Sequence, residues 1–134
     1  MDAPASPGLR GEVRHVVTDA DTAGAVGSGD VPVLATPRLL AWAEAAAIDA
    51  VRGALAAGRT SVGTRVRLEH LLPGPIGTQV CVRASLVHVD GRLLRFHVVA
   101  ELPEDSRVVA RGEITRVVVD RDRFLARLDG RAGD

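Results

Sequence analysis

One segment of this chain has the pattern of a long helix, whereas almost all of the remainder alternates like β-strand. Residues 34–57 read LATPRLLAWAEAAAIDAVRGALAA. Thr36 followed by Pro37 predicts the helix start, with Thr36 as N-cap and Pro37 in the first helical position. Gly58 predicts an end near residue 57. One long apolar helix must bury a face against other elements, which here can only be a sheet, so the expected class is α+β.

Five segments show the apolar alternation and turn signals of strands. Asp90-Gly91 separates two of them and is typical of a two-residue hairpin. Residues 19–33 are rich in Gly, Asp and Ala and are expected to form a loop. The expected order is therefore strand, helix and four further strands in a mostly antiparallel sheet. The expected strands span residues 9–18, 60–72, 78–89, 92–102 and 106–119.

The composition limits both domain number and function class. A chain of 134 residues fits one domain. We expect a flexible N-terminal arm over 1–8, a single domain over 9–128 and a C-terminal tail over 129–134. Seventeen basic and seventeen acidic residues leave no net charge to attract nucleic acid or an anionic membrane.

No apolar run approaches the ~18 residues of a membrane span, and the N-terminus lacks a signal-peptide pattern. Cys81 is the single cysteine, so no internal disulfide can form. We expect a cytoplasmic protein that binds no metal and needs no cofactor. Phosphate-binding loops, zinc-binding HExxH helices and GxSxG nucleophile elbows are absent from the sequence.

Glu44 lies in the middle of the expected helix. At about 100° per residue, Asp49 and Arg52 fall on the same side as Arg38. Glu44 falls on the opposite side, among Leu40, Ala47, Ile48, Val51 and Leu55. The pattern therefore predicts a carboxylate that points into the sheet, where an unpaired charge is costly. It is either a functional group or an acid that reaches a water-filled gap or a structural arginine.

Two strand residues are expected near that carboxylate. Alternation in residues 60–72 places His70 with Val62, Thr64, Val66 and Leu68 on the apolar face, and places Gly63 on the other face. An inward His alone is more often a core residue, but beside an inward Glu it can activate water or move a proton. Arg116 shares a face with apolar residues of the last strand. It is expected to be either a buried partner for Glu44 or another acid, or a contact for substrate or water. No obvious carboxylate stands at matching spacing from His15, His88 or His97, so these three are expected to be structural or surface residues.

These motifs resemble a known family. The segments VLATPRLLAWAE, SVGTRVRLEHLLP and ITRVVVDRDRF are similar to the fluoroacetyl-CoA thioesterase type of hotdog-fold acyl-CoA thioesterase, over roughly residues 9–125. The resemblance implies one long central helix wrapped by a mostly antiparallel five-stranded sheet. It also implies an acyl-CoA substrate and a homodimer with active sites near the subunit interface. Whether two dimers associate into a tetramer is not indicated.

The resemblance also implies residue roles. Thr36, Glu44 and His70 would form the catalytic set, with Glu44 as base or nucleophile. Gly63 and Arg116 would bind substrate, hold an oxyanion or order water. The fluoroacetyl-specific enzyme carries lid phenylalanines ahead of its threonine, whereas AGAVGSGDVPV here has no aromatic residue. A small or medium acyl-CoA is therefore expected.

Two alternatives to a thioesterase belong to other classes of function. A non-catalytic hotdog dimer would bind an acyl-thioester or another apolar ligand, and the small-residue loop before Thr36 fits that alternative. A hotdog dehydratase or hydratase fits less well, because the sequence lacks the His-containing DxNP-type segment.

Overall fold

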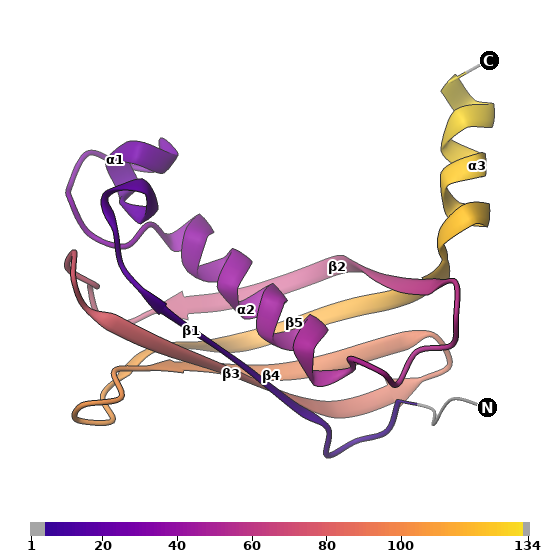
Figure 1. The fold of residues 1–134 in the computed structure, drawn as a ribbon, viewed down its shortest axis with the longest axis horizontal. Coiled ribbons are helices and arrows are strands. Elements are labelled where there is room, and N and C mark those ends of the chain that lie inside the picture. Colours follow the sequence, from indigo (N-terminus) through magenta and orange to yellow (C-terminus); the bar gives the residue numbers. More distant parts are fainter. Residues whose placement is uncertain (1–4, 133–134) are drawn as a thin grey trace.

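A five-stranded antiparallel sheet curls around one long helix in the computed structural model, which describes residues 5–132 (Figure 1). The order across the sheet is β1-β3-β4-β5-β2, so β1 and β2 are its edges. The predicted α+β class, with a central helix wrapped by five strands, is confirmed. The strands are β1 (Arg10–Val16), β2 (Arg59–His70), β3 (Gln79–Asp90), β4 (Leu93–Glu101) and β5 (Val108–Asp120).

The central helix, α2 (Thr36–Ala50), is shorter than the sequence predicts. The expected end near residue 57 is wrong because the chain turns at Gly53, whose φ of 80° is in the left-handed region. Gly58, with φ 81°, instead forms the turn that leads into β2. The Asp90-Gly91 signal does mark a tight hairpin, since Asp90 pairs with Leu93 across β3 and β4.

The core lies between α2 and the concave face of the sheet. The buried face of α2 consists mainly of small residues: Leu39, Trp42, Ala43, Ala46, Ala47 and Ala50. Alanines allow the helix to approach closely, and a Cβ on Gly11 of β1 would collide with the α2 backbone. Facing α2 are buried sheet residues such as Phe96 and Ile114, and each large side chain of this kind contributes about 2 kcal/mol on burial.

The segment expected to be a loop is partly helical. It contains a 3-10 turn η1 (Asp19–Asp21) and a short helix α1 (Ala23–Val26), and the Thr22 hydroxyl caps α1 by accepting from the Ala25 amide. The prediction missed both elements because their composition is that of a loop.

The last helix, α3 (Arg121–Ala132), continues from β5 and stands away from the sheet at the end opposite α1 (Figure 1). It crosses the expected boundary between the domain and the tail. Residues 1–4 of the expected arm and 133–134 of the expected tail lie outside the described residues. No helix within residues 5–132 is both long and apolar enough to cross a membrane.

Candidate active site

Glu44 points toward the sheet, as predicted, because its Oε2 lies against Gly63 of β2 and accepts from Arg116 of β5, but it lies outside the main core. The alanine-rich side of α2 is the side that is buried. Glu44 lies on a second, partly exposed face between Leu40 and Ile48, one turn away on either side. Its side chain is 34% exposed. The expected buried face was only partly right, because Val51 and Ala47 are buried whereas Ile48 is exposed. The buried side is completed by Leu39, Trp42 and the other alanines.

Arg116 holds the Glu44 carboxylate in place. The Arg116 side chain is only 7% exposed, and its Nη1 donates to Glu44 Oε2 at 2.9 Å. Its Nε donates to Ser61 Oγ and its Nη2 to the Ser61 carbonyl, both at 2.8 Å. Three of its donors are thereby fixed on β2 and α2, so the guanidinium is a rigid support. Of the two expected roles, partner of Glu44 is the one observed.

Gly63 is where the carboxylate meets the strand. A Cβ at this position would lie 2.6 Å from Glu44 Oε2 and 3.4 Å from Arg116 Nη1. Contacts as short as 2.6 Å are essentially never seen for a real Cβ. A glycine is therefore needed for the carboxylate to rest against β2.

A bulge in β2 places Gly63 on the same face as His70. Gly63 pairs with Arg116 of β5, and Arg65 pairs with the preceding residue, Thr115, so Thr64 is the extra residue. Directly paired residues point to the same side of a sheet. Gly63 therefore faces α2 together with Arg116, and His70 faces α2 with Ala110. The strict alternation used in the sequence-based prediction placed Gly63 on the wrong face.

The sequence-based reasoning also missed Ser61. Two residues before Gly63, it shares the face that the bulge creates, and both its hydroxyl and its carbonyl bind Arg116. Glycine within an alternating strand is the sequence signal for such a bulge.

Thr36 and His70 meet at the other end of α2. Thr36 Oγ1 lies 2.8 Å from His70 Nδ1. The predicted N-cap role of Thr36 is wrong, because the N-cap is Ala35 and Thr36 is already the first helical residue. Its hydroxyl is therefore free to bind the imidazole rather than the helix backbone. The prediction that His70 points toward the helix is confirmed.

Burial lowers the pKa of His70, and the nearby Leu72 backbone acts weakly in the opposite direction. The imidazole is therefore neutral near pH 7 and can accept a proton. Its Nε2 is buried and has no hydrogen-bond partner among the residues that the structure describes. A buried polar atom without a hydrogen-bond partner is a candidate to bind a substrate or water.

The site residues thus form two groups. We call Glu44, Arg116, Gly63 and Ser61 the carboxylate half-site, and Thr36 with His70 the hydroxyl half-site. Glu44 lies eight residues along α2 from Thr36, a rise of about 12 Å. The two half-sites of one chain therefore cannot both touch one thioester carbonyl.

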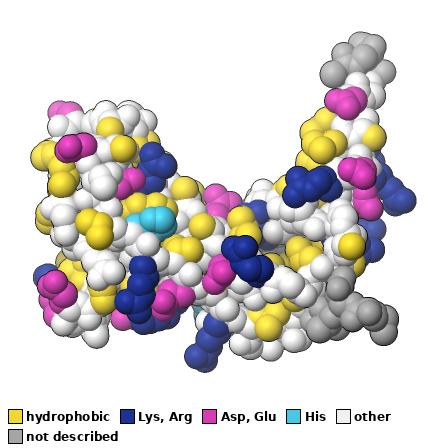
Figure 2. All heavy atoms as spheres, in the orientation of Figure 1, with side chains coloured by type: hydrophobic (Ala, Val, Ile, Leu, Met, Phe, Trp, Pro, Cys, Tyr) yellow, Lys and Arg dark blue, Asp and Glu magenta, His cyan; other side chains and the backbone are white. Residues whose placement is uncertain are grey.

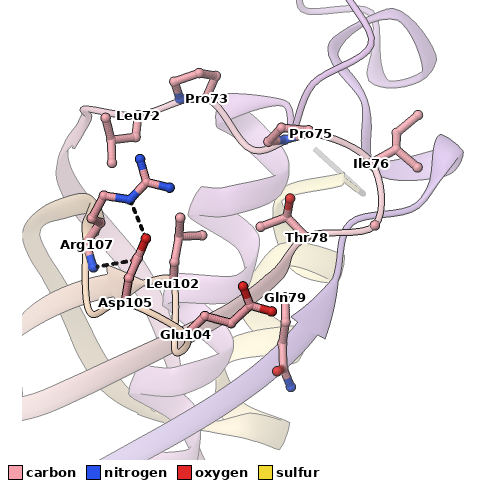
Figure 3. A pocket seen from close by; sticks show the side chains of 11 residues that line it. Leu72, Pro73, Pro75, Ile76, Thr78, Gln79, Leu102, Glu104, Asp105 and Arg107 are labelled. Atoms are coloured by element: carbon pink, nitrogen blue, oxygen red, sulfur yellow. Dashed lines mark hydrogen bonds and ion pairs between the residues drawn. The ribbon is translucent and has the colours of Figure 1, made fainter.

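The hydroxyl half-site opens into a hollow of about 420 Å³. Its walls come largely from the segment between α1 and α2, where Gly29, Val31, Val33 and Leu34 supply small or aliphatic surface. A larger neighbouring hollow of about 610 Å³ shares Leu72 and Pro73 with it. Figure 3 shows that larger hollow, with Glu104, Asp105 and Arg107 on its wall and Arg107 held by Asp105.

The remaining histidines and the cysteine lie outside both half-sites. His15 stacks on Trp42, with ring centroids 4.5 Å apart. His97 is exposed on the surface, as expected, and lies 3.3 Å from Glu113 on the adjacent strand, a partner that the sequence did not indicate. The partner was missed because it comes from strand pairing and not from spacing along the chain. Cys81 is buried, and burial is the main reason that the pKa of its thiol is raised.

Comparisons with known proteins agree with this architecture. Residues 17–122 match the family model described as fluoroacetyl-CoA-specific thioesterase (FlK). No curated protein matches the sequence. The solved structure of the fluoroacetyl-CoA thioesterase FlK is 26% identical, with a TM-score of 0.85, covering 94% of this chain and 96% of that chain.

Two further solved structures are equally similar. A variant of FlK in complex with acetyl-CoA is 25% identical, with a TM-score of 0.86 and coverage of 95% of this chain and 98% of that chain. The Thermus thermophilus protein TTHA0967, a thioesterase superfamily member, is 25% identical with a TM-score of 0.87, and 97% of each chain is covered.

The curled sheet around α2 is therefore the hotdog fold of thioesterases. The family match covers most of the chain, including both half-sites. The chain belongs to the fluoroacetyl-CoA-specific thioesterase family and is a thioester hydrolase.

Proposed function

We propose that this protein hydrolyses a small or medium acyl-CoA thioester to the free acid and CoA, with Glu44 as base or nucleophile and Thr36 and His70 as its catalytic partners. The observation that carries the proposal is the Glu44 carboxylate, which Arg116 fixes against Gly63 in a fold of the thioesterase class. Such rigid placement by a buried guanidinium is typical of a group that must meet a reacting atom.

Glu44 has one oxygen available for chemistry. Oε2 is bound to Arg116, whereas Oε1 forms no hydrogen bond with any residue in the described range. In the base route, Oε1 takes a proton from water as the water oxygen bonds to the thioester carbonyl carbon. In the nucleophile route, Oε1 itself bonds to that carbon, and water later cleaves the resulting anhydride. In both routes the carbon–sulfur bond breaks, and the CoA thiolate then takes up a proton.

Thr36 and His70 suit the opposite side of the carbonyl. Attack places negative charge on the carbonyl oxygen, and a hydroxyl oriented by an imidazole can donate to it. Thr36 also lies in the first turn of α2, where unpaired backbone amides favour negative charge. His70, neutral at rest, can move the proton that the leaving thiolate needs.

The hollow beside Thr36 supports an acyl group larger than fluoroacetyl. At about 420 Å³ it is within the usual range for ligand pockets, ~300–1,000 Å³. None of its lining residues is Phe, Tyr or Trp, so no large aromatic side chain closes it around a two-carbon acyl group.

A homodimer supplies what one chain lacks. β2 is a twelve-residue edge strand whose outer backbone groups have no partner strand within residues 5–132. Ile48 on the half-exposed face of α2 is 45% exposed, and Val66 on β2 is 46% exposed. Pairing two β2 edges antiparallel would extend the sheet across both copies and cover these apolar side chains.

One register joins the two half-sites. If the two β2 strands pair antiparallel with Arg67 of one chain opposite Arg67 of the second copy, then Glu69 of one chain lies opposite Arg65 of the other. The bulge at Thr64 then brings Gly63 opposite His70 of the second copy, on the same face. The carboxylate half-site of one chain thus meets the hydroxyl half-site of the other, and each dimer contains two complete sites.

The test is thiol release from a panel of acyl-CoA esters that runs from two-carbon to medium-chain acyl groups. We expect turnover by the wild type and a loss of at least about 100-fold in kcat for Glu44→Gln, which keeps the size of the side chain but not its basicity. Binding of the esters without release would favour the non-catalytic alternative. An unchanged rate in Glu44→Gln would contradict the assigned role of the carboxylate.

A further inference from the structure

Four arginines from three separate elements line one hollow at the base of α3. Arg59 begins β2, Arg92 lies in the β3–β4 turn, and Arg123 and Arg127 lie one turn apart on α3. Phe124 completes the wall of this hollow, whose volume is about 200 Å³. Figure 2 shows basic side chains interspersed with acidic ones along α3. We call this the arginine hollow.

The arginine hollow has little negative charge of its own. None of its four guanidiniums forms an ion pair with a carboxylate within residues 5–132, although most other ion pairs of the protein involve arginine. Asp120 is the single acid on its wall, and its Oδ1 accepts the backbone amide of Arg123 at 3.0 Å to cap α3. Like charges at i and i+4 destabilise a helix, so Arg123 and Arg127 together are costly without an anion.

The fold brings these charges together by strand pairing. Arg59 pairs directly with Asp120, the residue before α3. The Val118 amide donates to the Arg92 carbonyl at 2.9 Å, which places the β3–β4 turn beside the same end of β5. The opposite end of the sheet differs in charge, since the hollow of Figure 3 carries Glu104 and Asp105 with only Arg107, which Asp105 already binds. An anion is therefore favoured at α3 and not at the other end.

The spacing fits the substrate of the proposed function. Gly63 lies four residues along β2 from Arg59, a distance of about 13 Å. An extended thiol arm can span that distance from the arginine hollow to the carboxylate half-site. A second hollow of about 340 Å³ shares Arg59 and Arg92 with the first and is otherwise mainly aliphatic, with Leu55, Val89 and Leu94 on its wall. Phosphates and a planar base would thus find adjacent sites of matching chemistry.

We propose that the arginine hollow binds the phosphate groups of CoA, with the adenine in the adjoining aliphatic hollow and the pantetheine arm along β2 toward Gly63. The inference rests on the proposed acyl-CoA hydrolysis, and it assigns the recognition of the nucleotide end of the substrate. Guanidiniums bind phosphate oxygens in pairs of parallel hydrogen bonds, which suits the 3′-phosphate and the diphosphate of CoA.

The kinetic test compares substrates with and without phosphate. Arg123→Gln/Arg127→Gln is assayed with acetyl-CoA, with acetyl-dephospho-CoA and with the acetyl thioester of N-acetylcysteamine, which has no phosphate. The control is Arg95→Gln/Arg111→Gln, which removes the same charge from exposed positions on β4 and β5. We expect the α3 variant to raise KM for acetyl-CoA about 10–100-fold with kcat preserved, and to leave kcat/KM for the cysteamine thioester unchanged.

Two kinetic results would overturn the assignment. One is a loss of kcat/KM in the α3 variant that is as large for the cysteamine thioester as for acetyl-CoA, which would indicate a structural role for α3. The other is an unchanged KM for acetyl-CoA, or a change that the control reproduces. A smaller effect of the α3 variant on acetyl-dephospho-CoA than on acetyl-CoA would place the 3′-phosphate in the hollow.

Calorimetry separates this inference from the proposed function, because it needs no turnover. Adenosine 3′,5′-bisphosphate and CoA are titrated into the full-length wild type and both variants. If the wild type and the control bind these nucleotides and the α3 variant binds them at least about 10-fold more weakly, the result supports nucleotide binding in the arginine hollow even if no thioester is cleaved. If the wild type hydrolyses thioesters but binds no nucleotide, the assignment of the arginine hollow is contradicted, whereas the proposed hydrolase function is not. Inorganic phosphate that binds as tightly as the bisphosphate contradicts a nucleotide site.

Discussion

Gly63→Ala tests whether the position of Glu44 against β2 matters for catalysis. The added Cβ would lie 2.6 Å from Glu44 Oε2, whereas ordinary contacts begin at 3.4 Å, so the carboxylate must retreat by about 0.8 Å. Arg116 Nη1, already 3.4 Å from the same Cβ, limits where it can move. A misplacement near 1 Å costs ~100-fold in rate, so kcat/KM should fall about 100-fold, or ~2.7 kcal/mol of transition-state stabilisation.

Stability should change far less than activity in this variant. The contact is with the end of a flexible side chain, and the φ of Gly63 is not in the left-handed region, so alanine is tolerated by the backbone. The free energy of unfolding should change by less than ~1 kcal/mol. The assay is thiol release from acetyl-CoA together with the melting temperature. Gly24→Ala is the control, because its Cβ would meet nothing within 4 Å. Full activity in Gly63→Ala would refute the reasoning.

Three further perturbations follow from the same geometry. Arg116→Met should leave Ser61 and Glu44 without their partner and lower the free energy of unfolding by about 2 kcal/mol, measured by urea denaturation, together with a loss of kcat. Thr36→Val should lower kcat about 10–100-fold and leave the melting temperature nearly unchanged, because Thr36 does not cap α2, whereas Thr36→Ser should retain most activity. Burial lowers the pKa of His70 from its ordinary 6.5 in the folded protein. As the pH is lowered below 6.5, the unfolded chain is protonated before the folded one. The free energy of unfolding therefore decreases with decreasing pH until the folded-state pKa is passed. Urea denaturation at about pH 7.5 and about pH 5 should show this acid loss in the wild type and a smaller one in His70→Gln.

The strands and the central helix could be predicted from the sequence because their patterns are strong. Alternation located all five strands, and the Asp90-Gly91 pair located the hairpin. The sequence singled out Thr36, Glu44, Gly63, His70 and Arg116 as site candidates, and it missed Ser61. Their grouping was not predicted, since the bulge at Thr64 changes which residues share a face and no alternation rule shows where a bulge falls.

The orientation of α2 is the instructive failure. Large aliphatic side chains suggested a buried face around Leu40, Ile48 and Val51, but only Val51 is buried. The side of α2 that packs against the curled sheet consists mainly of alanines, with Leu39 and Trp42. Leu40 and Ile48 are left beside Glu44 on a face that one chain does not cover. Sequence periodicity finds an apolar face, and it cannot distinguish a face that packs within the chain from one that packs against a second copy.

The most direct test of the composite site is complementation between two impaired variants. Glu44→Gln removes the carboxylate of one half-site and Thr36→Val removes the hydroxyl of the other, so each homodimer alone should retain at most about a tenth of the wild-type activity. In coexpressed chains that pair at random, half of the dimers contain one of each, and each such dimer holds one intact site. Thioesterase activity should then recover to about a quarter of the wild-type value per chain. No recovery, with mixed dimers demonstrated by differently tagged chains, would contradict a site assembled from two copies.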